Sequence, residues 1–297
     1  MTTVEPRPVE ALLGSEAASL AAGAGALPTW RILLRRPTFV IGAVICAFWV
    51  FDAIFWPVLV PYSPQNAVTT AAHLAPSASH WFGTDRLGRD VLSRVLAGAA
   101  PVLSVAPAAT AIGVAAGTVI GLFTGYRRGW TDDVGMRVMD AMLTLPTIII
   151  AVVAVGLLGR SEVVVTLVIA VTFTPLVARV VRSSVLSERE RQYVEAAQIR
   201  GENALWILGR EILPNVTGPI VVESTVRLGY AIFNASALSF LSLGPQDPSP
   251  DWGLTIAENR PFIETQWWTV LFPALAIASL IIGINLVAEG LREARSR

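Results

Sequence analysis

Apolar residues occur in long runs along most of this chain, and the polar residues gather between the runs. A run of about 18 or more apolar residues is long enough to cross a bilayer as a helix. The sequence predicts about six such spans, at residues 38–60, 99–126, 134–158, 162–181, 216–243 and 267–288. Several contain Pro or Gly, which membrane helices tolerate because neighbouring groups satisfy the freed backbone. The pattern predicts an all-α integral membrane protein.

The composition agrees with a bilayer as the solvent. Of the 297 residues, 54% are hydrophobic and 15% are charged, whereas a soluble domain usually carries about 25% charged residues. Basic and acidic residues balance at 22 each, so no nucleic-acid partner is predicted. The single cysteine, Cys46, allows no disulfide framework. His73 and His80 share one loop without nearby Cys or carboxylate partners, so no metal site is predicted.

Arginine is distributed unevenly between the two sides of the membrane that these spans define. Most arginines lie in the N-terminal tail, after the second and fourth spans, and at the C-terminal end. The other side holds Arg86, Arg89, Arg94, Arg160 and Arg260. The positive-inside rule therefore predicts that the N- and C-termini are both cytoplasmic.

Four regions follow along the chain. Residues 1–30 are rich in Ala, Gly and Glu and lack the features of a cleavable signal peptide, so they are predicted to form a weakly ordered cytoplasmic tail. Residues 31–95 hold the first span and an extracytoplasmic loop. Residues 96–292 form the rest of the membrane core, and residues 293–297 form a cytoplasmic end.

The longest predicted cytoplasmic connection lies between the fourth and fifth spans. Residues 185–199 favour a helix that Gly201 ends, because a Gly just past a helix adopts the left-handed conformation readily. Asn203 can cap a second, short helix, and Pro214 ends that helix because it lacks an N–H. Ala196 and Ala197 are small enough to allow close packing at the turn.

The second short helix is predicted to be amphipathic. Leu205, Leu208 and Ile212 share one of its faces. A short helix of this kind, held on a tight turn, suits docking in a groove of a soluble partner. It suits lying on the membrane surface equally well, and the residues alone do not separate the two interpretations.

Charged residues inside the predicted spans are candidates for function. Arg227 lies about 16 Å into the fifth span, near the middle of the bilayer, where a charge is costly unless it is paired or faces water. Glu223 is one turn earlier and can pair with it. The two residues line a pathway for a charged substrate or form a buried pair that fixes packing. Asp140 and Asn234 are weaker pathway candidates, and Asp140 can instead lie near the cytoplasmic mouth, close to Arg137.

Residues 83–94 alternate charged residues with Val and Leu, as an interfacial helix on the outer face would. The functional alternative is a contact surface for a protein that delivers substrate. Its candidate residues are Asp85, Arg86, Arg89 and Asp90. Trp252, Trp267 and Trp268 fit an aromatic belt at the outer interface.

The loop between the fourth and fifth spans carries a family motif. Glu195-Ala196-Ala197, Gly201 and Leu213-Pro214 stand at the spacing EAA-x3-G-x11-LP, which resembles the cytoplasmic loop of ABC importer permeases. The resemblance implies that this loop is a coupling helix region that seats in an ATPase subunit and transmits its closure. The implied coupling residues are Glu195, Ala196, Ala197, Gly201, Asn203, Leu205, Leu208, Leu213 and Pro214.

Other stretches resemble the C-type subunit of the dipeptide, oligopeptide and nickel permease group. They include GTDRLGRDVLSR at 83–94, ALSFL at 237–241 and SPDWG at 249–253. The sequence departs from the group at Ala235, where members often carry Glu, and at Thr144, where members carry Ser. Glu223 and Arg227 stand where uncharged polar residues are common. These departures leave the fold and the coupling role intact and bear on the choice of substrate.

The resemblance implies a multi-pass cell-membrane permease that forms a pathway for short peptides, surrounded by membrane lipid. The implied partners are a homologous permease subunit in a heterodimer, two ATPase subunits, separate or fused, and an extracytoplasmic substrate-binding protein. The chain has no phosphate-binding loop, so it is predicted to be a non-enzyme that holds no cofactor, with ATP and Mg bound by the ATPase partners. Alternative substrates are nickel chelates, glutathione or another small solute. A secondary transporter and a membrane-embedded enzyme are the alternatives of a different class.

Overall fold

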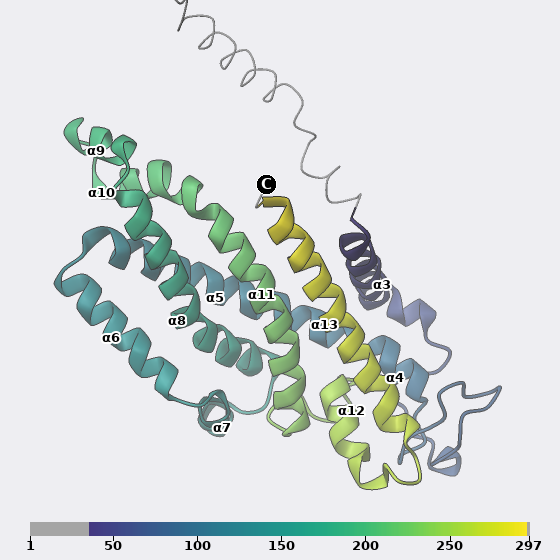
Figure 1. Ribbon diagram of the computed structural model, residues 1–297. Helices are drawn as coiled ribbons and strands as arrows, with labels where there is room; N and C mark the ends of the chain where they lie inside the picture. Colours follow the sequence, from purple (N-terminus) through teal and green to yellow (C-terminus); the bar gives the residue numbers. More distant parts are fainter. Residues whose placement is uncertain (1–35, 296–297) are drawn as a thin grey trace, which may run out of the picture.

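The computed structural model describes residues 36–295, and its regular elements are helices together with one isolated bridge between Thr84 and Asp90. Figure 1 shows an elongated bundle with α9 and α10 at one end and α12 at the other. We call these the α9 end and the α12 end. The last helix, α13, ends at the α9 end, near the point where α3 begins. The predicted tail at 1–30 lies outside the described residues.

Four helices of the described chain are long and apolar enough to cross a membrane. They are α3 (Pro37–Leu59), α4 (Val91–Ala97) continued by α5 (Ala99–Arg127), α8 (Glu162–Arg189) and α13 (Trp268–Arg295). They coincide with the first, second, fourth and sixth predicted spans. The fourth span was predicted to end at 181, but α8 continues to Arg189.

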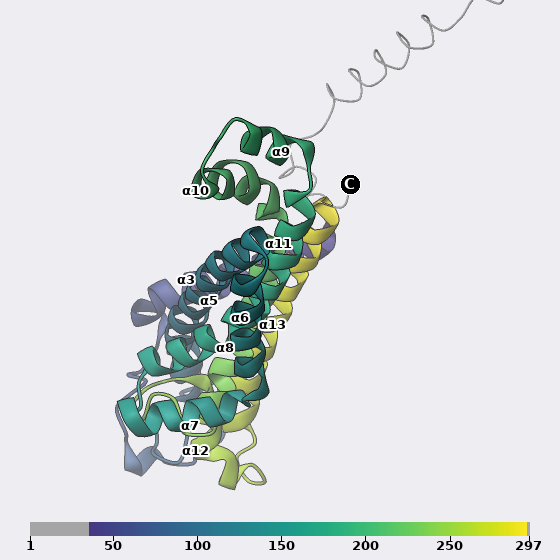
Figure 2. The same ribbon diagram turned by 90° about the vertical axis from the view of Figure 1, so that its left-hand side faces the viewer.

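The third predicted span, at 134–158, is not one straight helix. It consists of α6 (Trp130–Thr144) and α7 (Thr147–Leu158), whose axes differ by 87°. Leu145 between them is extended, with φ −86° and ψ 122°, because the ring of Pro146 disfavours helical geometry in the residue before it. Figure 2 shows α7 lying across the foot of the bundle while α6 runs along it.

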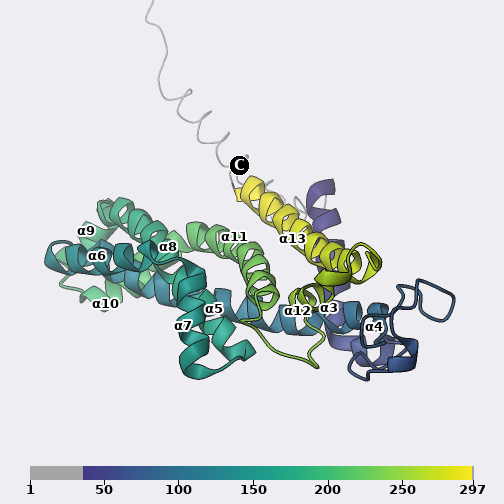
Figure 3. The ribbon, with the colours of Figure 1, turned by 90° about the horizontal axis from the view of Figure 1, so that it is seen from below.

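The fifth predicted span corresponds to α11 (Leu213–Phe240), whose 28 residues are long enough to cross a bilayer. It carries Glu223 and Arg227 and is not among the helices that meet both criteria, length and apolar composition. Length and composition therefore identify four spans in the described chain, or five if α6 and α7 count as one. About six were predicted. Seen from below in Figure 3, α11 lies in the middle of the molecule, and it contacts α5, α8 and α13.

The closest helix packing joins α5 to α8, and glycine allows it. Gly113, Gly117, Gly121 and Gly125 recur every fourth residue of α5. A Cβ atom at Gly117 would stand 2.6 Å from Cβ of Val177 on α8. Small residues at this spacing let membrane helices approach backbone to backbone.

Short elements close the two ends. At the α9 end, α9 (Gln192–Ile199), α10 (Ala204–Trp206) and a π-helix, η2 (Ile207–Ile212), join α8 to α11. At the α12 end, the loop after α3 contains η1 (Thr69–Ala71), and α12 (Trp252–Asn259) leads through η3 (Arg260–Phe262) to α13.

Candidate functional site

A hollow of about 230 Å³ opens where the bend between α6 and α7 faces α8 and α11. Two of the predicted pathway residues, Arg227 and Asn234, lie in its wall. Phe173 of α8 and Tyr230 of α11 contribute aromatic rings to the same wall. Because Pro146 breaks the helix here, the chain turns away and leaves this part of α11 uncovered.

The predicted pairing of Glu223 with Arg227 is confirmed. Nε and Nη2 of Arg227 lie 2.6 Å and 2.5 Å from the same Glu223 oxygen, Oε1. The side chains of Arg227 and Glu223 are 17% and 14% exposed, so the pair is largely but not fully removed from solvent. The guanidinium carbon of Arg227 also lies 5.8 Å from the ring centres of both Phe173 and Tyr230. Aromatic faces at this distance attract a cation.

Asn234 and Asp140 are placed differently. The Asn234 amide donates to the backbone oxygen of Tyr230 at 2.9 Å, which directs the amide along the open face of α11. Asp140 pairs with Arg179 of α8 at 2.5 Å, rather than with Arg137, its predicted neighbour at the cytoplasmic mouth. Asp140 is therefore part of an ionic contact between α6 and α8, and it is not among the residues that line the hollow.

A second, larger hollow of about 660 Å³ lies between α11 and α13. Gly229 and Tyr230 line it from α11, and Asn285, Glu289 and Arg292 line it from α13. A Cβ atom at Gly229 would meet Oδ1 of Asn285 at 3.1 Å, so glycine keeps the two helices close at this point. Tyr230 belongs to both hollows, which makes it the central residue of the open face of α11.

The predicted stop at Gly201 is confirmed in detail. Gly201 has φ +78°, its N–H bonds to the oxygen of Gln198 at 3.0 Å, and the N–H of Glu202 bonds to the oxygen of Ala197 at 3.2 Å. These two bonds form a Schellman cap. The predicted N-cap is also present, because Oδ1 of Asn203 accepts from the N–H of Trp206 at 2.8 Å.

Two other expectations for this loop are wrong. The helix expected at 185–199 breaks at Glu190 and Arg191, where α8 ends and α9 begins. Pro214 does not end the second helix, because α10, η2 and α11 follow one another without interruption. The π-helical turn supplies the reason: the N–H of Leu213 bonds five residues back, to Leu208. This wider turn accommodates the N–H that Pro214 lacks.

The loop has a buried side and an exposed side. Val194, Ala197, Ile207, Leu208 and Ile212 are buried in a small core against α5 and α8. Ile199 and Leu205 are 80% and 68% exposed, on either side of the Gly201 turn. The expectation that Leu205 shares a face with Leu208 and Ile212 is wrong, since the π-helix rotates them apart.

Several predicted coupling residues therefore lie at the surface. Glu195, Ala196, Gly201, Asn203, Leu205 and Pro214 are exposed, whereas Leu213 is half-buried. Figure 2 shows α9 and α10 standing out from the end of the bundle. The exposed side can meet a partner without disturbing the buried core.

The predicted contact surface at 83–94 is wrong for three of its four residues, since Asp85, Arg89 and Asp90 are buried. Arg89 bonds to Asp85 and Glu258, each at 2.6 Å, and to Asp247. Burial opposes the charge of Arg89, but Asp85 and Glu258 together outweigh it and raise the pKa of Arg89. Only Arg86 of the four remains partly exposed.

The interfacial helix expected at 83–94 begins only at Val91, as α4. Asp90 is its N-cap: the carboxylate accepts from the N–H of Ser93 at 2.8 Å. Nδ1 of His80 lies 2.9 Å from the same carboxylate, so the expectation that this histidine has no carboxylate partner is wrong. The charges of this segment fix its own fold.

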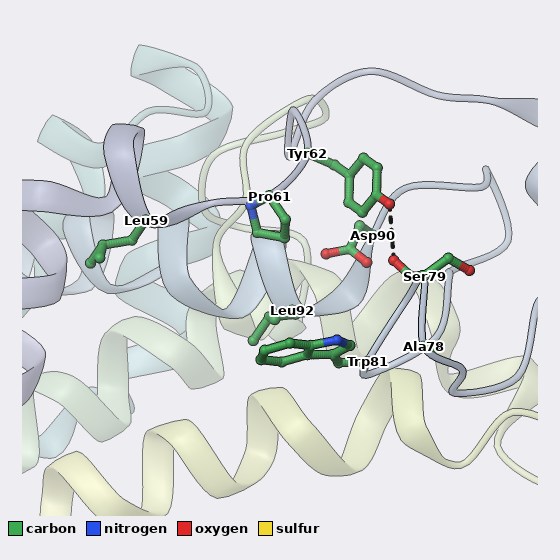
Figure 4. Close-up of a pocket in the computed structure, with 8 residues that line it drawn as sticks. All are labelled: Leu59, Pro61, Tyr62, Ala78, Ser79, Trp81, Asp90 and Leu92. Carbon is green, nitrogen blue, oxygen red and sulfur yellow. Dashed lines mark hydrogen bonds between the residues drawn. The ribbon is translucent and has the colours of Figure 1, made fainter.

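Next to this segment, a pocket of about 300 Å³ opens at the end of α3 (Figure 4). Its lining includes Leu59, Tyr62, Trp81 and Asp90, and the Tyr62 hydroxyl donates to the oxygen of Ser79 at 3.0 Å. Trp81 is 70% exposed. Exposed aromatic side chains at the end of a span are typical of the membrane interface.

The aromatic belt was predicted from three tryptophans, and only Trp267 of them is exposed. Trp252 is fully buried, where its Nε1 donates to the oxygen of Val95 at 2.7 Å, and Trp268 is buried with its Nε1 directed at Thr84.

The carboxylate of Asp251 caps the N-terminus of α12 by accepting from the N–H of Leu254 at 2.9 Å. Burial raises the pKa of Asp251 to about 6.

Comparison with known proteins decides what this architecture belongs to. Residues 117–296 match the family described as the binding-protein-dependent transport system inner membrane component. The chain belongs to this permease family. Residues 28–76 also match the N-terminal transmembrane domain of oligopeptide transport permease C. The predicted resemblance to a C-type ABC importer permease is confirmed, and so is a multi-pass location in the inner membrane.

Named relatives of this permease share its length. The dipeptide transport system permease protein DppC of Alkalihalophilus pseudofirmus is 38% identical over 273 residues, covering 91% of this chain and 90% of the relative. The probable D,D-dipeptide transport system permease protein DdpC of Escherichia coli is 36% identical, with 91% and 90% covered. The glutathione transport system permease protein GsiD of Pectobacterium atrosepticum is 35% identical, with 89% and 88% covered.

A solved structure shares the fold of this permease. It is an inward-facing form of the MetNI methionine ABC transporter, which aligns with a TM-score of 0.56 over 69% of this chain and 95% of the other. The sequence identity is 17%, so the likeness concerns the fold alone. It agrees with an ABC permease core built from the described helices.

The sequence of this permease gave no sign of the aromatic residues in the hollow. Phe173 and Tyr230 lie in apolar stretches where an aromatic residue carries no signal of its own. Asn285 offered a signal, because it is an uncharged polar residue inside the sixth predicted span, where such groups are uncommon. Its position opposite Gly229 depends on how α11 and α13 pack.

Proposed function

We propose that this permease is one of two membrane subunits of an ATP-driven importer for short peptides, with both chain ends in the cytoplasm. The observation that carries the proposal is the loop formed by α9 and α10, which projects from the bundle with Ile199 and Leu205 exposed on either side of a fixed turn. Two exposed apolar side chains on a preorganised turn suit a groove in a soluble partner. The family resemblance supports an ATPase subunit as that partner.

The continuity from α10 to α11 supports a coupling role. Since no break separates residues 204 and 240, a displacement of the loop by the ATPase passes directly along α11. Arg227 and Tyr230 lie on that helix and line the hollows. Closure of two ATPases on ATP binding would move α11 and open the pathway outward, and hydrolysis would reset it.

The uncovered surfaces support the proposed partner composition. The open face of α11, flanked by α6, α7 and α13, suits a homologous permease subunit that completes the pathway in a heterodimer. Two ATPase subunits would bind ATP and Mg²⁺ beneath the α9 end, so this chain would hold no cofactor. A binding protein would deliver substrate at the α12 end, where Arg86 is the accessible member of the predicted contact residues.

The substrate proposal rests on the named relatives. Two of those reported above are named as dipeptide permeases and support short peptides. The relative named as a glutathione permease supports glutathione as the second candidate. Nickel chelates and other small solutes have no comparable support among these relatives.

The test uses the complete importer in proteoliposomes. We expect Ile199→Glu and Leu205→Glu to abolish ATP-dependent uptake of labelled dipeptide and to release the ATPase on purification, because a buried charge at the interface is costly. Gln192→Glu, also exposed on α9 but away from the turn, is the matched control and should leave both measurements unchanged.

Uptake that continues normally in both loop variants would reject the coupling role. Uptake by wild type without any ATPase would reject the ATP-driven importer and favour a secondary transporter. Uptake of glutathione in place of dipeptides would change the proposed substrate but would still agree with an ATP-driven importer.

A further inference from the structure

The ion pair on α11 leaves one nitrogen of Arg227 and one oxygen of Glu223 outside the contact. Nε and Nη2 of Arg227 share one acceptor, Oε1 of Glu223. Within the described part of the chain, Nη1 of Arg227 and Oε2 of Glu223 have no partner. A pair whose only role was to fix packing would be expected to engage these groups as well, since unsatisfied polar groups are costly in a membrane.

Arg227 borders open space. The ring centres of Phe173 and Tyr230 each lie 5.8 Å from its guanidinium carbon, and all three residues line the 230 Å³ hollow. Asn234 adds an amide two turns along the same wall. The hollow thus offers a cation beside two aromatic rings and a polar amide, and Arg227 joins it to the Glu223 carboxylate one turn below, which is not among its lining residues.

The attachment points of the two side chains have a spacing that fits a short peptide. The charged groups themselves touch, with Nη2 of Arg227 2.5 Å from Oε1 of Glu223, but residues 223 and 227 are four positions apart on α11, a rise of about 6 Å. The termini of an extended dipeptide are at most about 7 Å apart, since each residue spans up to about 3.6 Å. Once the ion pair opens and each side chain lies near the level of its own Cα atom, one dipeptide can place its carboxylate at Arg227 and its ammonium at Glu223 at the same time.

We infer that Arg227 and Glu223 form a binding site for the two charged termini of a zwitterionic peptide in the pathway. The inference rests on the proposed function and names a recognition step within it. Entry of the zwitterion replaces one ion pair with two, so no charge is left without a partner. Arg227 binds the peptide carboxylate through Nη1 and Nη2, and Glu223 binds the ammonium group through Oε2.

The site would discriminate among substrates by charge. A peptide whose carboxylate is amidated, or whose amine is acetylated, can satisfy only one member of the pair and leaves the other uncompensated. A site built to bind a polar group rejects an analogue that lacks it, because its own groups are then left unpaired. The permease would thus select zwitterions independently of its binding protein.

The first test measures binding to the complete permease and ATPase complex in nanodiscs, without binding protein or nucleotide. The probes are Ala-Ala, Ala-Ala-amide and N-acetyl-Ala-Ala, and the method is saturation-transfer NMR. Wild type should bind Ala-Ala at least tenfold more tightly than either capped form. Arg227→Gln should remove the preference over the amide, and Glu223→Gln should remove the preference over the acetylated form.

Arg182→Gln is the matched control. It breaks an ion pair of similar length, to Asp132 at 2.5 Å, that lies between α6 and α8 and outside the hollow. It should leave both affinity ratios at their wild-type values. Equal binding of the three probes by wild type, or equal loss of all three in both α11 variants, would overturn the inference and leave a packing role for the pair.

A second test separates this inference from the proposed function. ATP-dependent uptake of Ala-Ala is measured in proteoliposomes that contain the complete importer, with wild type and with Arg227→Gln. Uptake by wild type together with loss of the preference over the amide in Arg227→Gln supports both proposals. Wild-type uptake with no effect of Arg227→Gln on the ratios rejects the inference alone, and absence of wild-type peptide uptake rejects the proposed function.

Discussion

At the scale of one residue, Asp52 is a polar side chain in a membrane helix that is expected to lower the stability of the fold. It lies in α3, it is 1% exposed, and within the described chain neither of its carboxylate oxygens has a hydrogen-bond partner. Three residues earlier, Trp49 satisfies its own Nε1 by donating to Ser279 at 2.9 Å. An unsatisfied carboxyl in this position is expected to destabilise the fold.

We predict that Asp52→Leu raises the thermal stability of the purified permease complex, by the equivalent of roughly 1–3 kcal/mol, and leaves uptake unchanged. Asp52→Asn is the matched control, since it keeps an unsatisfied polar group of the same size and should gain much less. Thermal unfolding followed by gel filtration measures both variants. A lower stability or lost uptake in Asp52→Leu would show that this carboxyl has a partner in the assembled transporter.

At the scale of elements, the junctions between helices determine where the candidate site lies. Pro146 turns α7 away from α6 by 87° and exposes the wall of the hollow. The π-helix before Pro214 keeps the coupling loop in line with α11. Both junctions adjoin α8, and the close, glycine-mediated packing of α8 against α5 holds that helix in place.

We predict that Gly117→Ala lowers stability by about 1–3 kcal/mol, because its new Cβ atom has no room against Val177 and the helices must separate. Gly156→Ala, at a helical position of α7 with no atom within 4 Å of the added Cβ, should be neutral or slightly stabilising. Thermal unfolding of the two variants in detergent compares them. Equal stability of both would mean that α5 and α8 do not pack as closely as described.

At the scale of the whole molecule, Arg89 joins segments that are far apart in sequence. It links the loop before α4 to Asp247 and Glu258, in and around α12. Arg94 reinforces the same connection by donating to the oxygen of Ser249 at 2.9 Å and to the hydroxyl of Thr255 at 3.0 Å. These buried contacts hold the α12 end together, so the charges of this motif serve the fold.

We predict that Arg89→Met destabilises the permease by about 3–5 kcal/mol, because it leaves the buried Asp85 carboxylate without its cation and removes one of the two cations near Glu258. Arg86→Met, which removes a partly exposed arginine 3.5 Å from Glu258, should change stability by less than about 1 kcal/mol. Resistance to proteolysis in the loops of the α12 end measures the difference. Equal resistance in the two variants would contradict the role assigned to Arg89.

The amino-acid sequence alone was enough to predict the all-helical membrane class, the positions of the four apolar spans, the Gly201 turn, the Asn203 cap and the pairing of Glu223 with Arg227. These features are local: they depend on the length of an apolar run, on the conformation that a glycine allows, or on residues one turn apart. For the same reason, the family motif around Gly201 can be identified from the order and spacing of its residues.

Features that depend on residues far apart in the sequence could be identified only from the folded structure. The bend at Pro146 and the continuation past Pro214 show that a proline does not reveal alone whether a helix breaks or adapts. The charges at Asp85, Arg89 and Asp90 suggested a surface, but distant carboxylates and backbone groups enclose them. Tyr230 is central because α8, α13 and the bend surround its helix, and no local pattern contains that arrangement.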